Sequence, residues 1–272
     1  MRGLLAPLSR RIIYHSGLKS GLGRLASRLD HLLPHVEERK LDIRLPDGLS
    51  IRIDPREFVG RHLFWAADYD PKIREVLIEN IRPGDRVLDI GAHCGTYGLR
   101  AARATGPTGR VVMVEPNPSL AADIAWCIER NGMRNIQVEE CAVGGSDGIA
   151  ELHFSGAESV TASLLPVTVG GSIANRSIEV RVRTIASIMH SSGMESLDVI
   201  KIDAEGLDDL IVGQVVGLRD LPRCIVFELH VAPDDDVWNS RTVSRLVAAG
   251  FEVRAIAKSF LGLRLLGRGE PA

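Results

Sequence analysis

The sequence predicts an α/β domain built on a doubly wound, mostly parallel sheet. Four short apolar runs, at residues 87–90, 111–114, 197–202 and 224–229, are too short for helices and are separated by helix-length segments. Parallel strands that helices cover on both faces read as continuous apolar runs of this kind. The 272 residues are 45% hydrophobic and 25% charged, a composition typical of a globular chain that buries a sizeable core.

The first segment of the chain predicts helices ahead of this domain. Leucine recurs at steps of four and three residues, at Leu18, Leu22, Leu25, Leu29 and Leu32, which places one apolar stripe along a helix. Residues 1–29 are basic and contain no acid. Such a helix can cap a core, form the seam of a homodimer or lie on an anionic membrane surface, and the same composition fits an organellar transit peptide.

Two further elements precede the sheet. Residues 41–53 alternate apolar and polar about Asp47-Gly48, a dipeptide suited to a tight turn, and so predict a β-hairpin. Asp70-Pro71 then opens an amphipathic helix that reaches Ile81. We therefore divide the chain into an N-terminal extension of helices and hairpin, residues 1–69, and a main domain, residues 70–272.

Residues 149–183 predict an insertion beside the main sheet, because strand-like pieces flank an uncharged loop. That loop, residues 159–175, is the longest uncharged run of the chain and is interrupted by proline and glycine. A membrane-spanning helix needs a longer and uninterrupted apolar run. The sequence therefore predicts no such span.

Charge and cysteine usage narrow the function further. Lys plus Arg number 33 against 35 Asp plus Glu, so we expect no nucleic-acid partner. The cysteines, Cys94, Cys127, Cys141 and Cys224, contain no CxxC pair for zinc or thiol exchange. They read as buried thiols of a reducing compartment, and we expect a cytoplasmic protein.

The candidate ligand site begins where the first apolar run meets a glycine-rich turn. Residues 87–98 read VLDIGAHCGTYG, a strand that passes through this turn into a helix. Glycines let backbone amides approach a ligand, and dinucleotide-binding and methyl-donor-binding folds both use such turns. Asp89, on the strand before Gly91, suits a cationic ligand better than a pyrophosphate. S-Adenosylmethionine carries both a sulfonium and an ammonium group.

A second acid stands at the end of the next strand. Glu115 follows residues 110–114 and precedes Pro116-Asn117-Pro118, where a carboxylate can accept the ribose hydroxyls of either cofactor class. A short-chain reductase would add a Tyr followed four residues later by Lys, and none of the three tyrosines has one. A short-chain reductase would thus lack its catalytic pair. A nicotinamide-dependent oxidoreductase is kept as an alternative, together with a non-catalytic nucleoside-binding module.

Five ordered motifs now point to one family. The segments VLDIGAHCGTYGLRAA, GRVVMVEPNPS, AVGGSDG, VIKIDAEGLDDLIVG and IVFELH resemble the FkbM family of S-adenosylmethionine-dependent methyltransferases. The resemblance covers about residues 70–230. It implies the seven-stranded, Rossmann-like sheet of class I methyltransferases and O-methylation of a hydroxyl, often on a sugar or natural product.

The resemblance also implies site residues. Within its motifs the candidate cofactor-binding residues are Asp89, Gly91, Ala92, His93, Gly95, Glu115, Asn117 and Ala142. Asp203, Glu205 and Gly206 match the family signature Asp-x-Glu-Gly. His93 stands where the family often has Asn, and Asp208 where Glu is common. Both departures leave the cofactor assignment intact and make the acceptor less certain.

Four polar residues at strand ends form the candidate catalytic group: Asp203, Glu205, Glu228 and His230. Ligands of open α/β sheets bind beyond the carboxyl ends of the strands. An alkyl hydroxyl must lose a proton as it is methylated, and His230 is the first choice of base because imidazole titrates near neutral pH.

Two alternatives to this catalytic group stay open. Glu205 also suits the N-terminus of the helix that follows it. Asp203, Glu228 and His230 also suit a divalent cation. We expect an O-methyltransferase that acts on a small molecule, a glycan or a glycolipid.

Overall fold

The computed structural model describes residues 40–154, 162–164, 168–169, 172–173, 176–204, 206–229, 237–258 and 263–268. The predicted N-terminal helices, with their dimer, membrane and transit-peptide interpretations, lie outside these residues, as do Glu205 and His230. The chain forms two compact units, Met1–Pro71 and Lys72–Ala272. Each unit is described by itself.

The described part of the first unit contains the predicted hairpin. Strands β1 (Leu41–Arg44) and β2 (Ser50–Ile53) pair antiparallel, and Gly48 in the turn has φ +83°. Helix α3 (Phe58–Ala66) follows and was not predicted from the sequence. It begins close to the chain that leaves the hairpin, since a Cβ at Gly60 would lie 1.9 Å from the carbonyl oxygen of Asp54.

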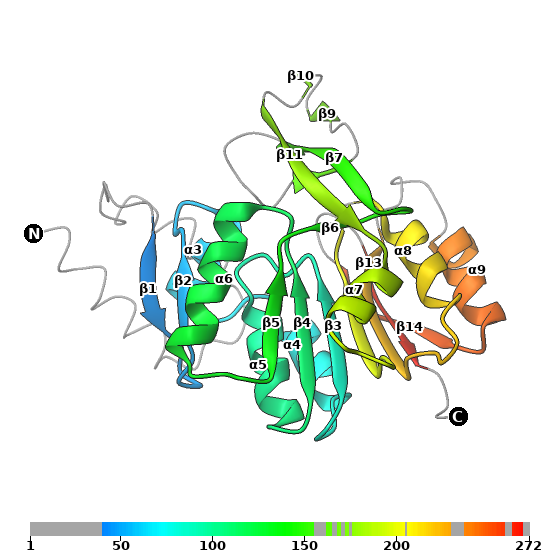
Figure 1. Ribbon diagram of the computed structural model, residues 1–272, viewed down its shortest axis with the longest axis horizontal. Helices are drawn as coiled ribbons and strands as arrows, with labels where there is room; N and C mark the ends of the chain where they lie inside the picture. Colours follow the sequence, from blue (N-terminus) through cyan, green and yellow to red (C-terminus); the bar gives the residue numbers. More distant parts are fainter. Residues whose placement is uncertain are drawn as a thin grey trace, which may run out of the picture. The chain divides into compact units, whose positions relative to one another are not determined.

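The second unit is built on a seven-stranded sheet in the order β14-β15-β13-β12-β3-β4-β5 (Figure 1). Its strands are β3 (Arg86–Ile90), β4 (Arg110–Val114), β5 (Ile136–Glu139), β12 (Val199–Ile202), β13 (Cys224–Leu229), β14 (Glu252–Lys258) and β15 (Leu263–Arg268). The five strands from β13 to β5 run parallel, and β15 is antiparallel to both of its neighbours. The predicted, mostly parallel α/β architecture is confirmed.

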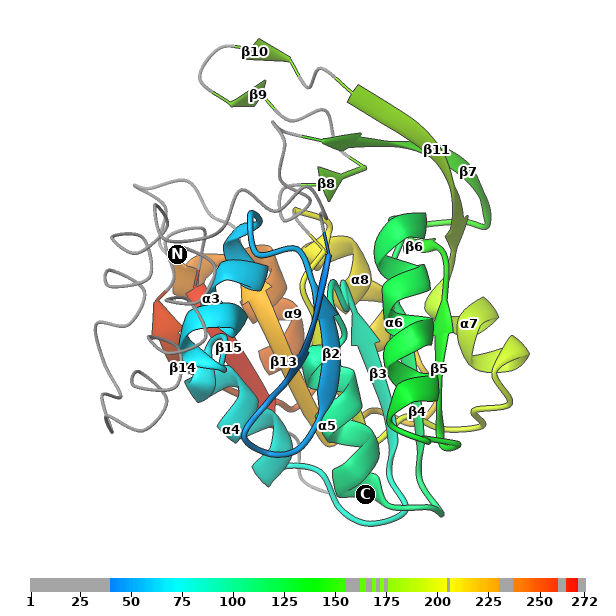
Figure 2. The ribbon, with the colours of Figure 1, turned by 90° about the vertical axis from the view of Figure 1, so that its left-hand side faces the viewer.

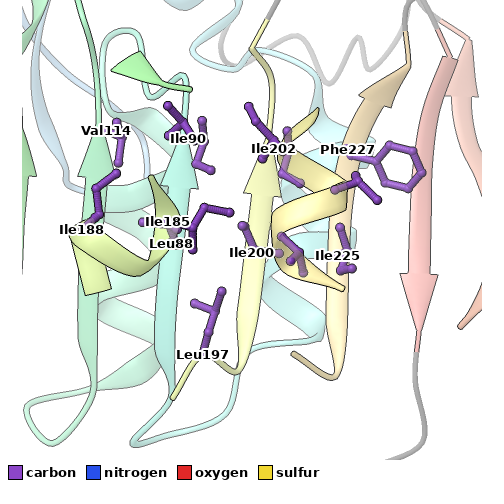
Figure 3. Packing of buried hydrophobic residues seen from close by; sticks show 14 of the residues in the cluster. Leu88, Ile90, Val114, Ile185, Ile188, Leu197, Ile200, Ile202, Ile225 and Phe227 are labelled. Carbon is purple, nitrogen blue, oxygen red and sulfur yellow. The ribbon is translucent and has the colours of Figure 1, made fainter. Parts of the chain in front are cut away.

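The helices of this unit are α4 (Pro71–Glu79), which begins at the last residue of the first unit, α5 (Thr96–Thr105), α6 (Pro118–Arg130), α7 (Ile185–Ser191), α8 (Asp208–Val215) and α9 (Arg241–Ala248), with a short 3-10 turn at Val237–Asn239. Alternate strand residues face opposite sides of the sheet. Leu88, Ile90, Ile200 and Ile202 pack with α7 and α8 in one fully apolar cluster (Figure 3). The residues between them, Asp89 and Lys201 among them, therefore face the side that α5 covers.

The insertion predicted at residues 149–183 forms part of a second sheet (Figure 2). Its strands β6 (Ala142–Val143), β11 (Arg176–Arg183), β7 (Gly148–Phe154) and β8 (Ala162–Ser163) are ordered β6-β11-β7-β8, and a separate pair joins β9 (Thr168–Val169) to β10 (Ser172–Ile173). Only Glu140 and Cys141 separate β5 from β6, so this sheet continues from the carboxyl edge of the main sheet.

An ion-pair network joins the opposite, amino ends of the main strands. Arg223, just before β13, donates to the carboxylate of Asp85 and to the carbonyl oxygen of Asn80, and its Nη1 lies 3.5 Å from Asp198 Oδ1. The amide of Arg86 donates in turn to Asp198 Oδ2 at 2.7 Å. The network fixes the starts of β3, β12 and β13 relative to one another.

The four cysteines are buried thiols, as predicted, and none forms a disulfide. Within the described residues, no helix combines the length and the apolar character needed to cross a bilayer.

Candidate functional site

The glycine turn, residues 91–95, connects β3 to α5 through three residues with positive φ. Gly91, His93 and Gly95 have φ values of +70°, +52° and +75°. A Cβ at Gly91 would lie 1.9 Å from the carbonyl oxygen of Asp203, so glycine is required there by space as well as by φ. The amides of Gly91 and Ala92 both donate to the carbonyl oxygen of Val114, at 3.0 and 3.1 Å. The turn thus lies directly against the ends of β4 and β12.

Glu115 holds the glycine turn from the end of β4. Its Oε2 accepts a hydrogen bond from the His93 amide at 2.8 Å, and its Oε1 accepts one from the Asn117 amide at 2.9 Å. The side chain is buried, and burial raises its pKa to about 7, although the two amides lower it. Each carboxylate oxygen has a second lone pair, so these contacts leave the predicted role toward ribose hydroxyls available.

Two other predicted cofactor residues have structural contacts of their own. Asn117 is the N-cap of α6, where its side chain accepts from the Ser119 amide at 3.0 Å. Ala142 packs with Leu152 and Val180 in the core of the second sheet. Asn117 and Ala142 therefore each have a role in the local structure, as a helix cap and as a core residue.

Lys201, in the middle of β12, was not predicted from the sequence and links the glycine turn to Asp203. Its side chain is 3% exposed, and its Nζ donates to the carbonyl oxygens of Gly91 at 2.7 Å and Ile90 at 3.2 Å. The same Nζ lies 3.3 Å from Asp89 Oδ1 and 3.6 Å from Asp203 Oδ2. A lysine inside the apolar run Val199–Ile202 is the signal that points to it, because a buried ammonium must be paired.

Asp89 is almost completely buried on the strand before the turn. Neither of its carboxylate oxygens has a hydrogen-bond partner of normal geometry in the described part of the chain. Burial raises the pKa of Asp89, while the Lys201 ammonium and the Gly98 backbone lower it. Gly98 allows α5 to come this close, since a Cβ there would lie 2.3 Å from the sulfur of Met113. The result is a buried carboxylate with unused acceptor capacity.

Asp203 and Glu228 lie at the carboxyl ends of neighbouring strands. Asp203 directly follows β12, and its amide donates to the carbonyl oxygen of Ile90 at 3.2 Å. Glu228 is buried in β13, two residues beyond the partner of Lys201 in the sheet register, and so faces the same side as Lys201. The structure therefore brings Asp89, Lys201 and Asp203 together and places Glu228 on the adjacent strand.

His93 lies in the glycine turn, and its pKa is shifted. Burial, followed by the Lys201 charge, lowers the pKa of His93 to about 4, which makes its imidazole neutral at physiological pH.

The described residues contain no group of three His, Cys, Asp or Glu side chains arranged to hold a metal ion. The predicted set of metal ligands includes His230, which is not described, so metal binding stays a prediction.

Comparison with known proteins adds a family match. Residues 89–260 match the family model described as the methyltransferase FkbM domain. The matched segment starts at Asp89 and includes the glycine turn, Glu115, Lys201 and Asp203. The family match therefore covers both the glycine turn and the strand ends that carry the candidate catalytic residues.

Individual relatives share only limited sequence identity with this chain. The ribosomal RNA large subunit methyltransferase E of Sorangium cellulosum is 28% identical over 156 residues, which are 56% of this chain and 67% of that protein. The protein-L-isoaspartate O-methyltransferase of Aeropyrum pernix is 37% identical over 70 residues, 26% of each chain. Among solved structures, M. jannaschii TYW2 in complex with AdoMet is 13% identical, with a TM-score of 0.47 and coverage of 85% of this chain and 86% of that one.

The first of these relatives corrects one prediction. We expected no nucleic-acid partner from the balanced charge, yet a protein named as a ribosomal RNA methyltransferase is related to this chain. The prediction was wrong because net charge averages over the whole surface, whereas binding to nucleic acid depends on where the positive charges lie.

Proposed function

The chain belongs to the FkbM family of methyltransferases, and on this premise we propose that it methylates a hydroxyl group of a sugar, glycolipid or natural-product acceptor. The methyl donor is S-adenosylmethionine. One observation supports an acceptor site next to the donor site: Asp203, the first residue of the Asp-x-Glu-Gly signature, lies against the glycine turn, with its carbonyl oxygen 1.9 Å from where a Cβ of Gly91 would be. A substrate bound at Asp203 is thereby next to the donor.

The residues present fit the donor. The buried carboxylate of Asp89, with its unused acceptor capacity, suits a cationic ligand, and the absence of a Cβ at Gly91 lets Asp203 lie against the glycine turn beside it. Glu115 would hold the ribose hydroxyls. When bound, S-adenosylmethionine supplies a methyl group activated by its sulfonium.

The chain's own contribution to the reaction is orientation and proton removal. Alignment of the acceptor with the donor supplies much of the acceleration of a displacement reaction. The acceptor hydroxyl must lose its proton, and we assign that role to His230, with Asp203 as the alternative. The Asp203 side chain is 20% exposed, which leaves it accessible to an acceptor. Glu205 and Glu228 would position the acceptor through hydrogen bonds.

RNA is a second candidate acceptor, favoured by the relative named as a ribosomal RNA methyltransferase. Ribose 2′-hydroxyls make RNA chemically equivalent to a sugar acceptor at this site. The two candidates therefore share one reaction and differ in the surface that recognises the acceptor.

Transfer of labelled methyl groups from S-adenosylmethionine into separated fractions of a cell extract tests the proposal. We expect alkali-stable label, as in a methyl ether, in the polysaccharide, lipid or small-molecule fraction. Label that ribonuclease releases as nucleotides or short oligonucleotides with a methylated ribose would instead favour RNA. Alkali-labile methyl esters, or no transfer by a preparation that binds the donor, would contradict hydroxyl methylation. Asp203→Asn provides the matched control for site-dependent transfer.

A further inference from the structure

Lys201 has an arrangement of partners that a purely structural lysine does not need. Two of its N–H donors are used by the carbonyl oxygens of Ile90 and Gly91, which fixes the first residue of the glycine turn to β12. The ammonium also lies between two carboxylates, one on the donor side at Asp89 and one on the acceptor side at Asp203. The Tyr97 ring, centred 5.5 Å from Nζ, covers it further.

The charges of this group can be counted. Within this group of three side chains, two carboxylates and one ammonium leave one net negative charge. S-Adenosylmethionine has one net positive charge, from a sulfonium and an ammonium against one carboxylate. Its demethylated product, S-adenosylhomocysteine, has lost the sulfonium charge and is neutral overall. Buried charges interact strongly, so this difference affects binding.

We propose that Lys201 is a positioning residue that keeps the carboxylates of Asp89 and Asp203 charged, so that the Asp89–Lys201–Asp203 group attracts the positively charged methyl donor more strongly than its neutral product. The proposal rests on the proposed function only through the donor and is independent of the acceptor. Lys201 acts through Asp89, Asp203 and the Gly91 carbonyl, without contacting the methyl group itself.

Other titratable groups near Asp89 must be considered in a pH experiment. Lys201 and Asp203 come from β12 and its end, Glu115 from the end of β4 and His93 from the glycine turn, and Tyr97 on α5 and Glu228 on β13 belong to the same face. The pKa of His93, about 4, leaves it neutral from pH 6 upward. Glu115, with a pKa of about 7, also titrates in that range, and the Lys201 charge lowers its pKa, so the Lys201 variants are compared in a Glu115→Gln background as well.

Calorimetric titration of the full chain with S-adenosylmethionine and S-adenosylhomocysteine tests the proposal in three variants. Lys201→Gln keeps a donor for the carbonyls and removes the charge, and Lys201→Arg keeps the charge. Lys201→Gln combined with Asp203→Asn restores the original net charge. Without the ammonium, the two carboxylates repel each other and Asp89 takes up a proton, so it no longer attracts the positive charge of the donor. Near pH 6 we therefore expect Lys201→Gln to weaken S-adenosylmethionine binding at least about tenfold, to weaken S-adenosylhomocysteine binding much less, and to be partly rescued in the double variant.

The pH dependence has a definite sign. Without the ammonium the pKa of Asp89 rises further, so Asp89 binds a proton and loses its charge as the pH falls. The affinity deficit of Lys201→Gln for the donor should therefore be largest near pH 6 and shrink toward pH 9, whereas Lys201→Arg should follow the wild-type profile. Lys72→Met, at an exposed lysine of α4, is the control for loss of a lysine.

A purely structural role predicts a different pattern. Equal losses for the two ligands, a deficit independent of pH and no rescue by Asp203→Asn would overturn the proposal. Ile200→Ala, on the apolar face of the same strand, calibrates how strand damage alone affects both ligands. If Lys201→Gln does not fold, the double variant and Lys201→Arg decide, since a double variant with the original net charge that prefers the product would also contradict the proposal. Acceptor methylation plays no part in these measurements, so failure of the proposed acceptor chemistry is recognised separately.

Discussion

Glu115 shows how one buried carboxylate serves both the fold and the site. It accepts from the His93 and Asn117 amides, which orients the glycine turn toward the end of β4. Burial nevertheless raises its pKa to about 7, so ionisation in the folded chain is opposed by the environment. The site thus contains a carboxyl group that titrates at physiological pH.

This raised pKa makes the free energy of unfolding depend on pH. An unfolded glutamate titrates near 4.5, so the folded form binds its proton more tightly, and the free energy of unfolding should fall as the pH rises from about 4.5 to 7. Glu115→Gln removes this loss, which amounts to about 3 kcal/mol by the shift in pKa. We expect the stability of Glu115→Gln relative to wild type to increase between pH 5 and pH 8 in urea unfolding. Parallel pH curves for the two proteins would contradict it.

His230 carries the prediction about the base. Its replacement by Ala should lower kcat by about 10² to 10⁴-fold and leave the affinity for S-adenosylmethionine unchanged, because a base acts on the acceptor proton. In the wild type, kcat/KM should rise with pH through the pKa of the base, and this limb should vanish in the variant. His190→Ala, at an exposed histidine of α7, is the control. Normal turnover of a folded His230→Ala protein would transfer the role to Asp203.

At the scale of elements, the site depends on how closely the turn and α5 approach the strands. Gly91 and Gly98 leave out the two Cβ atoms that would collide with Asp203 and Met113. Glycine within a helix costs stability, so its presence in α5 has a packing reason. The close approach brings α5 over the buried charges of β3 and β12.

Gly91→Ala tests this packing against a matched position. Gly132 has a similar φ, +64° against +70°, and nothing lies within 4 Å of its Cβ position. Gly132→Ala should therefore cost only the backbone strain, about 1 kcal/mol, and leave donor binding unchanged. Gly91→Ala should destabilise the protein further and weaken S-adenosylmethionine at least about tenfold, as measured by thermal unfolding and calorimetry. Similar behaviour of the two variants would show that space at Gly91 is unimportant.

At the scale of the whole second unit, an ion-pair network and the candidate site lie at opposite ends of the sheet. Arg223, Asp85 and Asp198 connect the strand starts, whereas Asp89, Lys201 and Asp203 belong to the carboxyl end. The ion pairs at the amino end have no part in the donor site. Their loss should therefore affect folding and leave the ligand alone.

The Arg223→Leu variant tests whether the two ends of the sheet act independently. It removes one partner of a buried ion pair, and the free energy of unfolding should fall by about 3 kcal/mol because Asp85 is left uncompensated. Affinity for S-adenosylmethionine should stay within about twofold of wild type. Arg219→Leu, at an exposed arginine, should change neither quantity. A large loss of donor affinity in folded Arg223→Leu would mean that the two ends are coupled.

Local patterns in the sequence were sufficient for the central parallel strands of the main sheet and for the hairpin. The apolar runs predicted β3, β4, β12 and β13 because a buried parallel strand has no polar face, and Asp47-Gly48 predicted the hairpin because its turn needs a positive φ. The ordered motifs predicted the family, which the match over residues 89–260 confirms. These features depend on residues close together in the chain.

Tertiary structure alone decided how the charges of the site are arranged. Asp89 and Lys201 are 112 positions apart in the chain and become neighbours only through the register of β3 with β12. The steric need for Gly91 depends likewise on the distant Asp203. Pairing of remote strands determines which buried charges meet, and a single sequence does not encode that register locally. The sequence therefore determined the central strands, the glycine turn and the family, while the fold decided that Lys201 lies between the carboxylates of Asp89 and Asp203.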